Sequence, residues 1–306
     1  MSILITGSSG LIGTALIDRL REQGRGVTRL VRDQRTSVPG TTDVRWDPAA
    51  GTIDEEGLER AGPFDGVVHL AGAGIGDRRW TPARKKVVHD SRTGSTQLLV
   101  GALLQLPTPP PALVSGSAVG FYGDRGDEEL TEVSSVGTGF LAGLCRTWEH
   151  AAEPATDAGI RTVLLRTGIV ISGHGGVLGK QLPLFRLGLG GRTGTGRQYR
   201  SWITIEDEIG VILRCLDDDR LSGPVNATSP APATDAELAK ALGAALHRPT
   251  VLSVPASAIR LALGSEMAGE LVLAGQRVLP SVLMAHDHRF VHTDLTEAVR
   301  SVLEST

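Results

Sequence analysis

A glycine-rich segment near the start of the chain has the residue types and spacing of a phosphate-binding turn. Gly7, Gly10 and Gly13 recur at three-residue spacing, after the predicted strand 2–5 and at the start of the amphipathic stretch 11–23. Gly7 allows a tight turn, Gly10 lets a pyrophosphate approach the backbone, and Gly13 lets the helix pack closely on the strand. The helix N-terminus adds unpaired N–H groups and a partial positive charge. The segment therefore predicts a dinucleotide-binding site.

The residues after the second predicted strand, 26–31, indicate which dinucleotide binds. Sites for NAD usually place Asp or Glu there, on the ribose 2′-hydroxyl. This chain has Arg32 instead, with Arg29 and Arg35 nearby. A guanidinium group suits a 2′-phosphate, so the sequence predicts NADP(H) as the cofactor. Asp33 lies beside Arg32, and the alternative that these arginines are solvated surface residues stays open.

The elements that must position these residues alternate along the first 170 residues. We predict strands at 2–5, 26–31, 66–70, 112–115 and 162–165, and helices at 11–23, 81–106 and 139–158. This alternation predicts an α/β fold with a Rossmann-type, doubly wound parallel sheet, whose carboxyl edge binds ligands. After Gly173 the pattern loosens, and further helices are expected at 205–216, 235–246, 256–264 and 294–303. We expect an NADP-binding Rossmann domain at 1–175, with some later segments returning to it, and a smaller substrate or cap lobe at 176–306.

Composition limits the function classes that fit the chain. The 306 residues are 41% hydrophobic and 21% charged, with a formal net charge of −3. This balance gives no reason to expect nucleic acid or an anionic membrane as a partner, and no apolar run is long enough to span a bilayer. The N-terminus has no basic region typical of a signal peptide, and the two cysteines are far apart. We therefore expect a cytoplasmic protein that binds a small molecule, with its oligomeric state open.

Three further segments carry a resemblance to the extended short-chain dehydrogenase/reductases, whose glycine spacing this chain shares. His69–Gly72 resembles the NLAG segment beside the adenine and ribose, and Leu164–Val170 resembles the LRxGxV strand on the nicotinamide side. Trp202–Asp207 resembles the WIHIxD segment of the substrate lobe. The resemblance implies that NADP(H) is bound by Gly7, Ser9, Gly10, Leu11, Ile12, Gly13, Val31, Arg32, Leu70, Ala71, Gly72, Arg92, Arg166, Thr167 and Gly168.

Other motifs narrow the resemblance to one subgroup, and together they cover essentially the whole chain. They are Trp46–Pro48, Ser91–Arg92, Ser115–Gly123, Phe140–Glu149 and Leu273–Pro280. This pattern is similar to the atypical epimerase-like family described as nucleoside-diphosphate-sugar epimerases of the SulA type. The subgroup typically carries a C-terminal module of unknown role, here at about 248–298. The resemblance implies an NADP-dependent oxidoreductase or epimerase that acts on a small carbonyl compound or a nucleotide-linked sugar.

The usual catalytic pair of this superfamily is missing. Its dehydrogenases use Tyr-xxx-Lys with an upstream Ser or Thr to move the proton at the substrate oxygen. Aligning the helix on Glu149 places Leu141 and Cys145 at the Tyr and Lys positions. The catalytic candidates that remain follow the fourth main strand: Ser115, Ser117 and Tyr122. The alternatives are that the two serines satisfy local backbone groups and that the tyrosine lines a pocket.

Two functions therefore stay open. The first is an NADPH-dependent oxidoreductase or epimerase in which Ser117 or Ser115 polarises the substrate oxygen. The alternative is a non-catalytic NADP(H)-binding regulatory protein, with a link to cell division as one option. The cluster His286, His288 and His292 fits none of the standard zinc spacings, so we expect no metal site.

Overall fold

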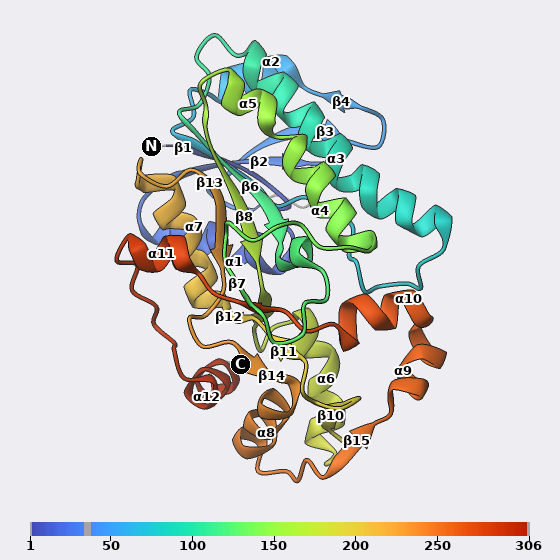
Figure 1. The fold of residues 1–306 in the computed structure, drawn as a ribbon. Helices are drawn as coiled ribbons and strands as arrows, with labels where there is room; N and C mark the ends of the chain where they lie inside the picture. Colours follow the sequence, from blue (N-terminus) through green and yellow to red (C-terminus); the bar gives the residue numbers. More distant parts are fainter. Residues whose placement is uncertain (1, 34–37, 305–306) are drawn as a thin grey trace.

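The computed structural model describes residues 2–33 and 38–304, and it is built around one twisted eight-stranded sheet (Figure 1). The strand order is β13-β8-β6-β5-β1-β2-β3-β4, and every neighbouring pair is parallel except β3 and β4. The strands are β1 (Ser2–Thr6), β2 (Gly26–Val31), β3 (Thr42–Asp47), β4 (Thr52–Ile53), β5 (Gly66–His69), β6 (Ala112–Ala118), β8 (Arg161–Thr167) and β13 (Gly223–Ala227). The predicted Rossmann-type sheet is confirmed.

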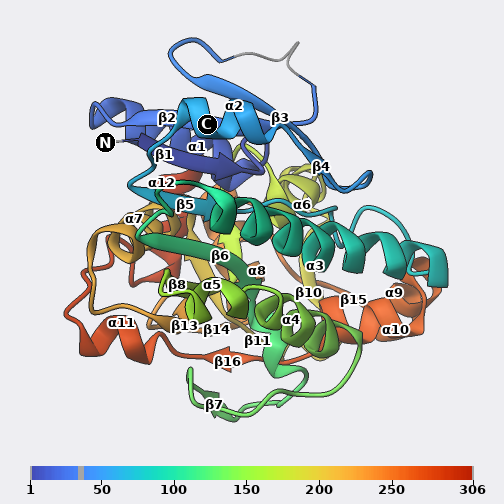
Figure 2. The same ribbon diagram turned by 90° about the horizontal axis from the view of Figure 1, so that it is seen from above.

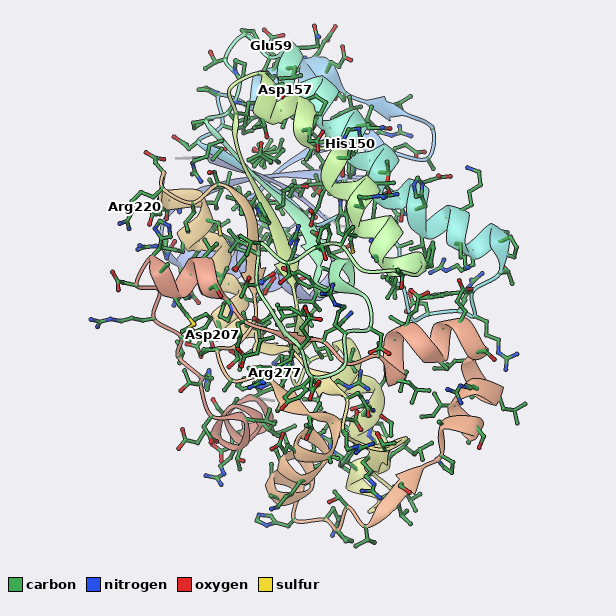
Figure 3. The ribbon with its side chains drawn as sticks, viewed as in Figure 1. Glu59, His150, Asp157, Asp207, Arg220 and Arg277 are labelled. Carbon is green, nitrogen blue, oxygen red and sulfur yellow. The ribbon has the colours of Figure 1, made fainter. Side chains whose placement is uncertain are left out.

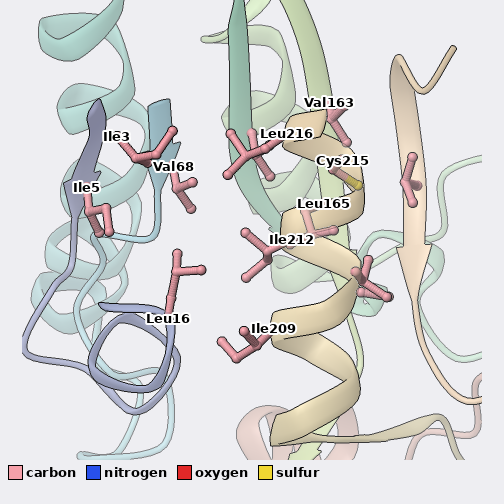
Figure 4. Close-up of a cluster of buried hydrophobic side chains, with 14 of the residues drawn as sticks. Ile3, Ile5, Leu16, Val68, Val163, Leu165, Ile209, Ile212, Cys215 and Leu216 are labelled. Carbon is pink, nitrogen blue, oxygen red and sulfur yellow. The ribbon is translucent and has the colours of Figure 1, made fainter. Parts of the chain in front are cut away.

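Helices cover both faces of this sheet, as Figure 2 shows from above. One face carries α1 (Leu11–Glu22), α7 (Ile205–Asp217) and α11 (Ser281–Ala285), and the other carries α2 (Glu55–Ala61), α3 (Pro82–Gln105), α4 (Phe140–His150) and α5 (Glu153–Asp157). The apolar pattern of the strands produces this arrangement, since alternate side chains point to opposite faces. Ile3, Ile5 and Val68 pack towards α1 and α7 (Figure 4), whereas Leu4 and Val67 pack towards α2 and α3.

Shorter elements gather beyond the carboxyl ends of the main strands. They are β7 (Glu129–Leu130), β9 (Ile169–Ile171), α6 (Gly176–Arg186), β10 (Gly191–Thr193), β11 (Tyr199–Arg200), β12 (Trp202–Thr204), β14 (Ala233–Thr234), α8 (Asp235–Leu246), β15 (Leu252–Val254), α9 (Ala256–Leu263), α10 (Ser265–Ala268), the π-helical segment Gly269–Leu273, β16 (Arg277–Val278) and α12 (Leu295–Glu304). Residues 252–304 are here called the C-terminal segment. Figure 3 places Asp207 and Arg277 at this end of the molecule, and Glu59 and Asp157 at the other.

The sequence analysis did not predict β3, α2 or β13, and two further helical regions differ from it for a clear reason. The helix predicted over 139–158 is two helices, α4 and α5, and Pro154 lies in the first turn of α5, where its missing N–H costs nothing. The helix α6 was not predicted because Gly176, Gly179 and Pro183 interrupt its apolar pattern. Within residues 2–33 and 38–304, no helix is both long and apolar enough to cross a bilayer.

Candidate functional site

The glycine-rich turn between β1 and α1 closes tightly on its neighbours. Gly7 has a φ of 68°, and a Cβ there would lie 2.6 Å from the carbonyl carbon of Leu70. A Cβ on Gly13 would lie 2.3 Å from the Gly7 oxygen, so the first turn of α1 packs directly on the glycine turn. Gly10 precedes α1 with extended backbone, and its N–H donates to the Gly7 oxygen at 2.9 Å. Larger residues at 7 and 13 would push the turn apart.

The N-terminus of α1 has no side-chain cap among the described residues, and its first turn contains no acidic residue. The first N–H groups of a helix have no intrahelical acceptor, and the helix dipole makes this end favourable for an anion. Ser9 and Gly10 are exposed there, and Leu11 and Ile12 are half-buried. The turn therefore fits the pyrophosphate that the sequence predicts for it.

A buried polar relay fixes the neighbouring strand end. Thr6 Oγ1 accepts from the backbone N–H groups of Leu70 and Ala71 at 3.1 and 3.2 Å, and it lies 2.7 Å from His69 Nδ1. His69 Nε2 in turn lies 3.0 Å from Thr96 Oγ1 on α3. Burial lowers the pKa of His69 to about 3, so its ring is neutral at physiological pH. The relay holds the predicted cofactor residues Leu70 and Ala71 against the glycine turn.

Two of the three arginines near the end of β2 lie among the described residues, and their surroundings differ. The Arg29 side chain is buried, and it forms a two-pronged ion pair with Asp43 on β3, at 2.8 and 2.7 Å. Arg32 follows the buried Val31 at the carboxyl end of β2 and is exposed. Arg35 lies outside the described residues. Of the two described arginines, Arg29 is buried in an ion pair and Arg32 is exposed at the carboxyl end of the strand.

Gly72 and Arg92 are brought together on the α3 side of the edge. A Cβ on Gly72 would lie 3.1 Å from Arg92 Cζ, and Arg92 Nη1 donates to the Ala73 oxygen at 2.9 Å. The guanidinium also lies over the Trp148 ring, with Cζ 5.1 Å from the ring centroid. The bare backbone at Gly72 is what allows this cation to approach the loop after β5.

The catalytic candidate Ser117 belongs to a buried ion-pair network. Its Oγ donates to Glu149 Oε1 at 2.6 Å, and Arg166 holds both oxygens of the same carboxylate at 2.8 and 2.9 Å. Ser117, Glu149 and Arg166 are all less than a tenth exposed. The network joins β6, α4 and β8, and it uses both the Ser117 proton and the Arg166 guanidinium, which the sequence predicted for substrate and cofactor.

Tyr122 extends this network towards β13. Its hydroxyl donates to Asn226 Oδ1 at 2.7 Å and accepts from Arg166 Nη1 at 3.0 Å. The side chain is fully buried, and burial raises the pKa of Tyr122 above its usual value. In this position the hydroxyl connects Arg166 of β8 to Asn226 of β13.

The two positions that replace the usual Tyr and Lys face the turn after β6. A Cβ on Gly120 would lie 3.3 Å from Leu141 Cβ and 3.7 Å from Cys145 Sγ. Burial raises the pKa of Cys145 to about 12, so its thiol stays protonated. Leu141 packs in an apolar cluster with Ile75, Trp80, Val88, Phe140, Leu144 and Leu271. Neither residue is an acid or base near neutral pH.

The remaining predicted residues lie in the middle of β6 and at the end of β8. Ser115 is fully buried, and its Oγ has no hydrogen-bond partner among the described residues. Thr167 is half-buried and donates to Glu208 Oε1 on α7 at 2.9 Å. The Gly168 N–H donates to the Ala227 oxygen, and a Cβ on Gly168 would lie 2.4 Å from the Ser201 oxygen. Glu208 was not a candidate in the sequence analysis, although it shares a helix face with Ile212 and Cys215.

No cluster of potential metal ligands is found in the part of the chain that the structure describes. His292 Nδ1 instead lies 3.5 Å from Asp207 Oδ2, and the Asp207 carboxylate accepts from the backbone N–H groups of Val291 and His292. This arrangement anchors the C-terminal segment to the start of α7.

Comparison with known families gives two matches that together span most of the chain. Residues 3–227 match the NAD-dependent epimerase/dehydratase family, and residues 254–302 match a domain of unknown function, DUF1731. These matches confirm the resemblance that the sequence motifs indicated.

Individual relatives are similar over almost the whole length of this chain. The epimerase family protein Mb2239 of Mycobacterium bovis is 44% identical over 297 residues, covering 97% of this chain and 96% of that protein. The crystal structure of human epimerase family protein SDR39U1 (isoform 2) with NADPH has a TM-score of 0.89 at 33% identity, covering 100% of both chains. The nucleoside-diphosphate sugar epimerase of Corynebacterium glutamicum has a TM-score of 0.80 at 37% identity, covering 99% of this chain and 58% of the other.

Proposed function

Since the chain belongs to the NAD-dependent epimerase/dehydratase family, we propose that it binds NADP(H) and catalyses hydride transfer on a small carbonyl compound or a nucleotide-linked sugar. The observation that carries the cofactor part is the uncapped N-terminus of α1 behind the Gly7 turn, with the exposed Arg32 at the end of β2. The human relative solved with NADPH supports the choice of NADP(H) over NAD(H).

The proposed cofactor would lie in one orientation along the carboxyl edge of the sheet. Backbone N–H groups of Leu11 and Ile12 would hold the pyrophosphate, and Arg32 would hold the 2′-phosphate beyond β2. The strand order then directs the nicotinamide half towards β5, β6 and β8, on the other side of β1. When bound, the cofactor supplies a hydride donor or acceptor there. Leu70, Ala71 and Gly72 would line the path between the two halves.

The hydroxyl groups predicted as catalytic have a different proposed role. The hydroxyl groups of Ser117 and Tyr122 both donate their hydrogen bonds within the protein, to Glu149 and Asn226. We propose that they hold the β6 and β8 ends in register through Arg166, and that Ser115 is the hydroxyl with hydrogen-bonding capacity left to offer.

The cofactor proposal is tested by titrating the protein with NADPH and NADH. The wild type should bind NADPH more tightly, and Arg32→Ala should weaken NADPH by about 10- to 100-fold with little effect on NADH, since a charge-assisted bond contributes about 1.5–3 kcal/mol. Arg60→Ala is the control, because it removes an exposed arginine beside Glu59, at the far end of the sheet (Figure 3). A wild type that prefers NADH, or an unchanged NADPH affinity in Arg32→Ala, would contradict the proposal.

A second function is favoured by Leu141 and Cys145, which remove the usual proton-transfer pair. It is a non-catalytic protein that binds NADP(H) and reports the cofactor state to a partner. A panel of carbonyl compounds and sugar nucleotides, assayed by NADPH oxidation, separates the two. Tight NADPH binding with no turnover on any compound supports this second function, and turnover that survives Ser117→Ala supports an enzyme whose acid lies elsewhere.

A further inference from the structure

Glu208 is a buried carboxyl group that the proposed site has not yet used. It is fully buried, its Oε1 lies 2.9 Å from Thr167 Oγ1, and its Oε2 has no partner among the described residues. An unpaired carboxylate is costly to bury, so such a group keeps its proton instead. Burial raises the pKa of Glu208 to about 8, although the Thr167 hydroxyl lowers it in part. At neutral pH the side chain is a carboxylic acid.

The position of Glu208 is directly beneath the carboxyl edge of the sheet. It lies in the first turn of α7, one and two turns before Ile212 and Cys215, whose side chains pack with Val163 and Leu165 of β8 (Figure 4). Thr167, the last residue of β8, connects Glu208 to that edge.

The distance along the edge fits the proposed direction of the cofactor. β8 lies three strands from β1, in the order β1, β5, β6, β8, so at about 4.8 Å per strand Thr167 lies roughly 14 Å from the glycine turn. This is the side of the edge opposite Arg32, where the proposed function places the nicotinamide half and the substrate.

The charged groups around Glu208 point elsewhere. Arg166 lies on the opposite face of the sheet with Glu149, and His69 on β5 points to Thr96 of α3. Asp207, next to Glu208 on α7, accepts from the backbone of 291 and 292. Cys215 is the titratable neighbour on the same helix face, and burial raises its pKa to about 12. Among the described contacts, the Thr167 hydroxyl is therefore the polar group with which Glu208 can exchange a proton.

The Thr167 hydroxyl has two states that depend on this proton. An ionised Glu208 can only accept, so Thr167 must donate to it. A protonated Glu208 can donate to Thr167 Oγ1 across the same 2.9 Å, which frees the Thr167 proton for a ligand. We propose that Thr167 and Glu208 form the proton-donating pair of the site and replace the acid that Leu141 and Cys145 cannot supply.

This pair acts in the hydride transfer of the proposed function, on which the inference rests. As hydride reaches a carbonyl carbon, the electron pair of the C=O bond moves to the oxygen, which takes the Thr167 hydroxyl proton. Thr167 takes the Glu208 proton in the same step, and Glu208 becomes a carboxylate that is reprotonated from solvent. The reverse sequence accepts a proton when an alcohol is oxidised. Thr167 is the group that touches substrate, and Glu208 is a positioning residue that acts through it.

The test uses binding rather than turnover. A carboxylate near the nicotinamide favours the cationic NADP⁺, and the neutral acid does not, so the Kd ratio of NADP⁺ to NADPH should fall as pH rises from 6.5 to 9.5. A change of about tenfold corresponds to a shift of one pKa unit in Glu208 between the two complexes. The 2′-phosphate is common to both nucleotides, so its own titration cancels in the ratio.

Two variants make the result specific to this pair. Glu208→Gln should give a ratio that does not change with pH, and Thr167→Val should move the midpoint to higher pH, because it removes the bond that lowers the pKa of Glu208. Glu132→Gln is the matched control, since Glu132 is another buried carboxyl with one unpartnered oxygen and a pKa raised by burial, but it contacts Asn226 and Val282. It should keep the wild-type dependence.

The outcomes separate this inference from the proposed function. A flat ratio in the wild type with firm NADPH binding, or an unchanged dependence in both Glu208→Gln and Thr167→Val, overturns the proton-donating pair and leaves the cofactor proposal standing. Failure of the wild type to bind either nucleotide overturns both. If a carbonyl substrate is found, NADPH oxidation should decline above about pH 8 in the wild type, and Glu208→Gln should abolish that decline.

Discussion

Glu270 caps a helix that begins 130 residues earlier in the chain. Its Oε1 accepts from the Phe140 N–H at 2.9 Å, and its Oε2 accepts from the Leu141 N–H at 2.8 Å. The preceding Gly139 has a φ of 102°, and a Cβ there would lie 2.8 Å from Glu270 Oε1. The glycine thus admits the carboxylate to the end of α4, and the C-terminal segment supplies a cap that the local sequence lacks.

We expect Glu270→Ala to lower the free energy of unfolding by about 1–2 kcal/mol, the range typical of a lost N-cap. Glu270→Gln keeps one acceptor oxygen and should lose less. Urea denaturation at neutral pH measures both. Glu266→Ala is the control, because Glu266 in the same segment forms a more exposed ion pair with Lys85, of the kind worth at most about 1 kcal/mol. Equal losses at 266 and 270 would show that the cap contributes nothing of its own.

Gly13→Ala should abolish cofactor binding as well as destabilise the fold. The added methyl would lie 2.3 Å from the Gly7 oxygen, so the glycine turn and α1 must separate. We expect loss of detectable NADPH binding and a destabilisation of about 1–3 kcal/mol, in the range of an overpacked site. Gly101→Ala is the control: a Cβ on this exposed glycine in α3 would have no atom within 4 Å, and alanine should stabilise the helix by about 0.5–1 kcal/mol. Normal NADPH binding by Gly13→Ala would remove the close-packing argument.

Acid should destabilise the protein through His69. The folded-state pKa of about 3 lies below the ordinary value of 6.5, so the unfolded chain binds a proton between these values that the folded chain does not. The free energy of unfolding therefore falls as pH decreases below about 6.5, by about 2 kcal/mol at pH 5 from this residue. His69→Gln should lessen the difference in stability between pH 7 and pH 5, and the same change at the exposed His150 should not. An equal acid response in the wild type and His69→Gln would contradict the assignment.

The glycine turn between β1 and α1 could be predicted from the sequence because the evidence for it is local. Gly7, Gly10 and Gly13 lie within one turn and one helix start, and their spacing alone describes the geometry. Arg29 shows the limit of such reasoning: its partner Asp43 becomes a neighbour only when β2 and β3 pair in register across an intervening loop. Arg32 lies just beyond the last paired residue of β2, and the sequence alone does not reveal that the two arginines differ in this way.

The catalytic end depends on contacts between distant parts of the chain. Ser117 meets Glu149 across 32 residues, and Tyr122 meets Asn226 across 104. Their residue types predict catalysis, and the partners that the fold gives them underlie the structural role proposed above. Glu208 could have been found from the sequence, because it stands four and seven residues before Ile212 and Cys215 on the apolar face of the predicted helix 205–216. A charged residue on such a face is unusual and marks a buried ionisable group.

The cap at Glu270 is one of several contacts between the C-terminal segment and the rest of the protein. Arg200 donates to the Leu271 oxygen, Asp207 accepts from the backbone of Val291, and β16 pairs with β7 in parallel. A segment attached in this way is not an independent module. Grafting it onto another member of the family requires that its contact residues on the Rossmann domain be grafted too. On heating, it should unfold together with the Rossmann sheet in one cooperative transition.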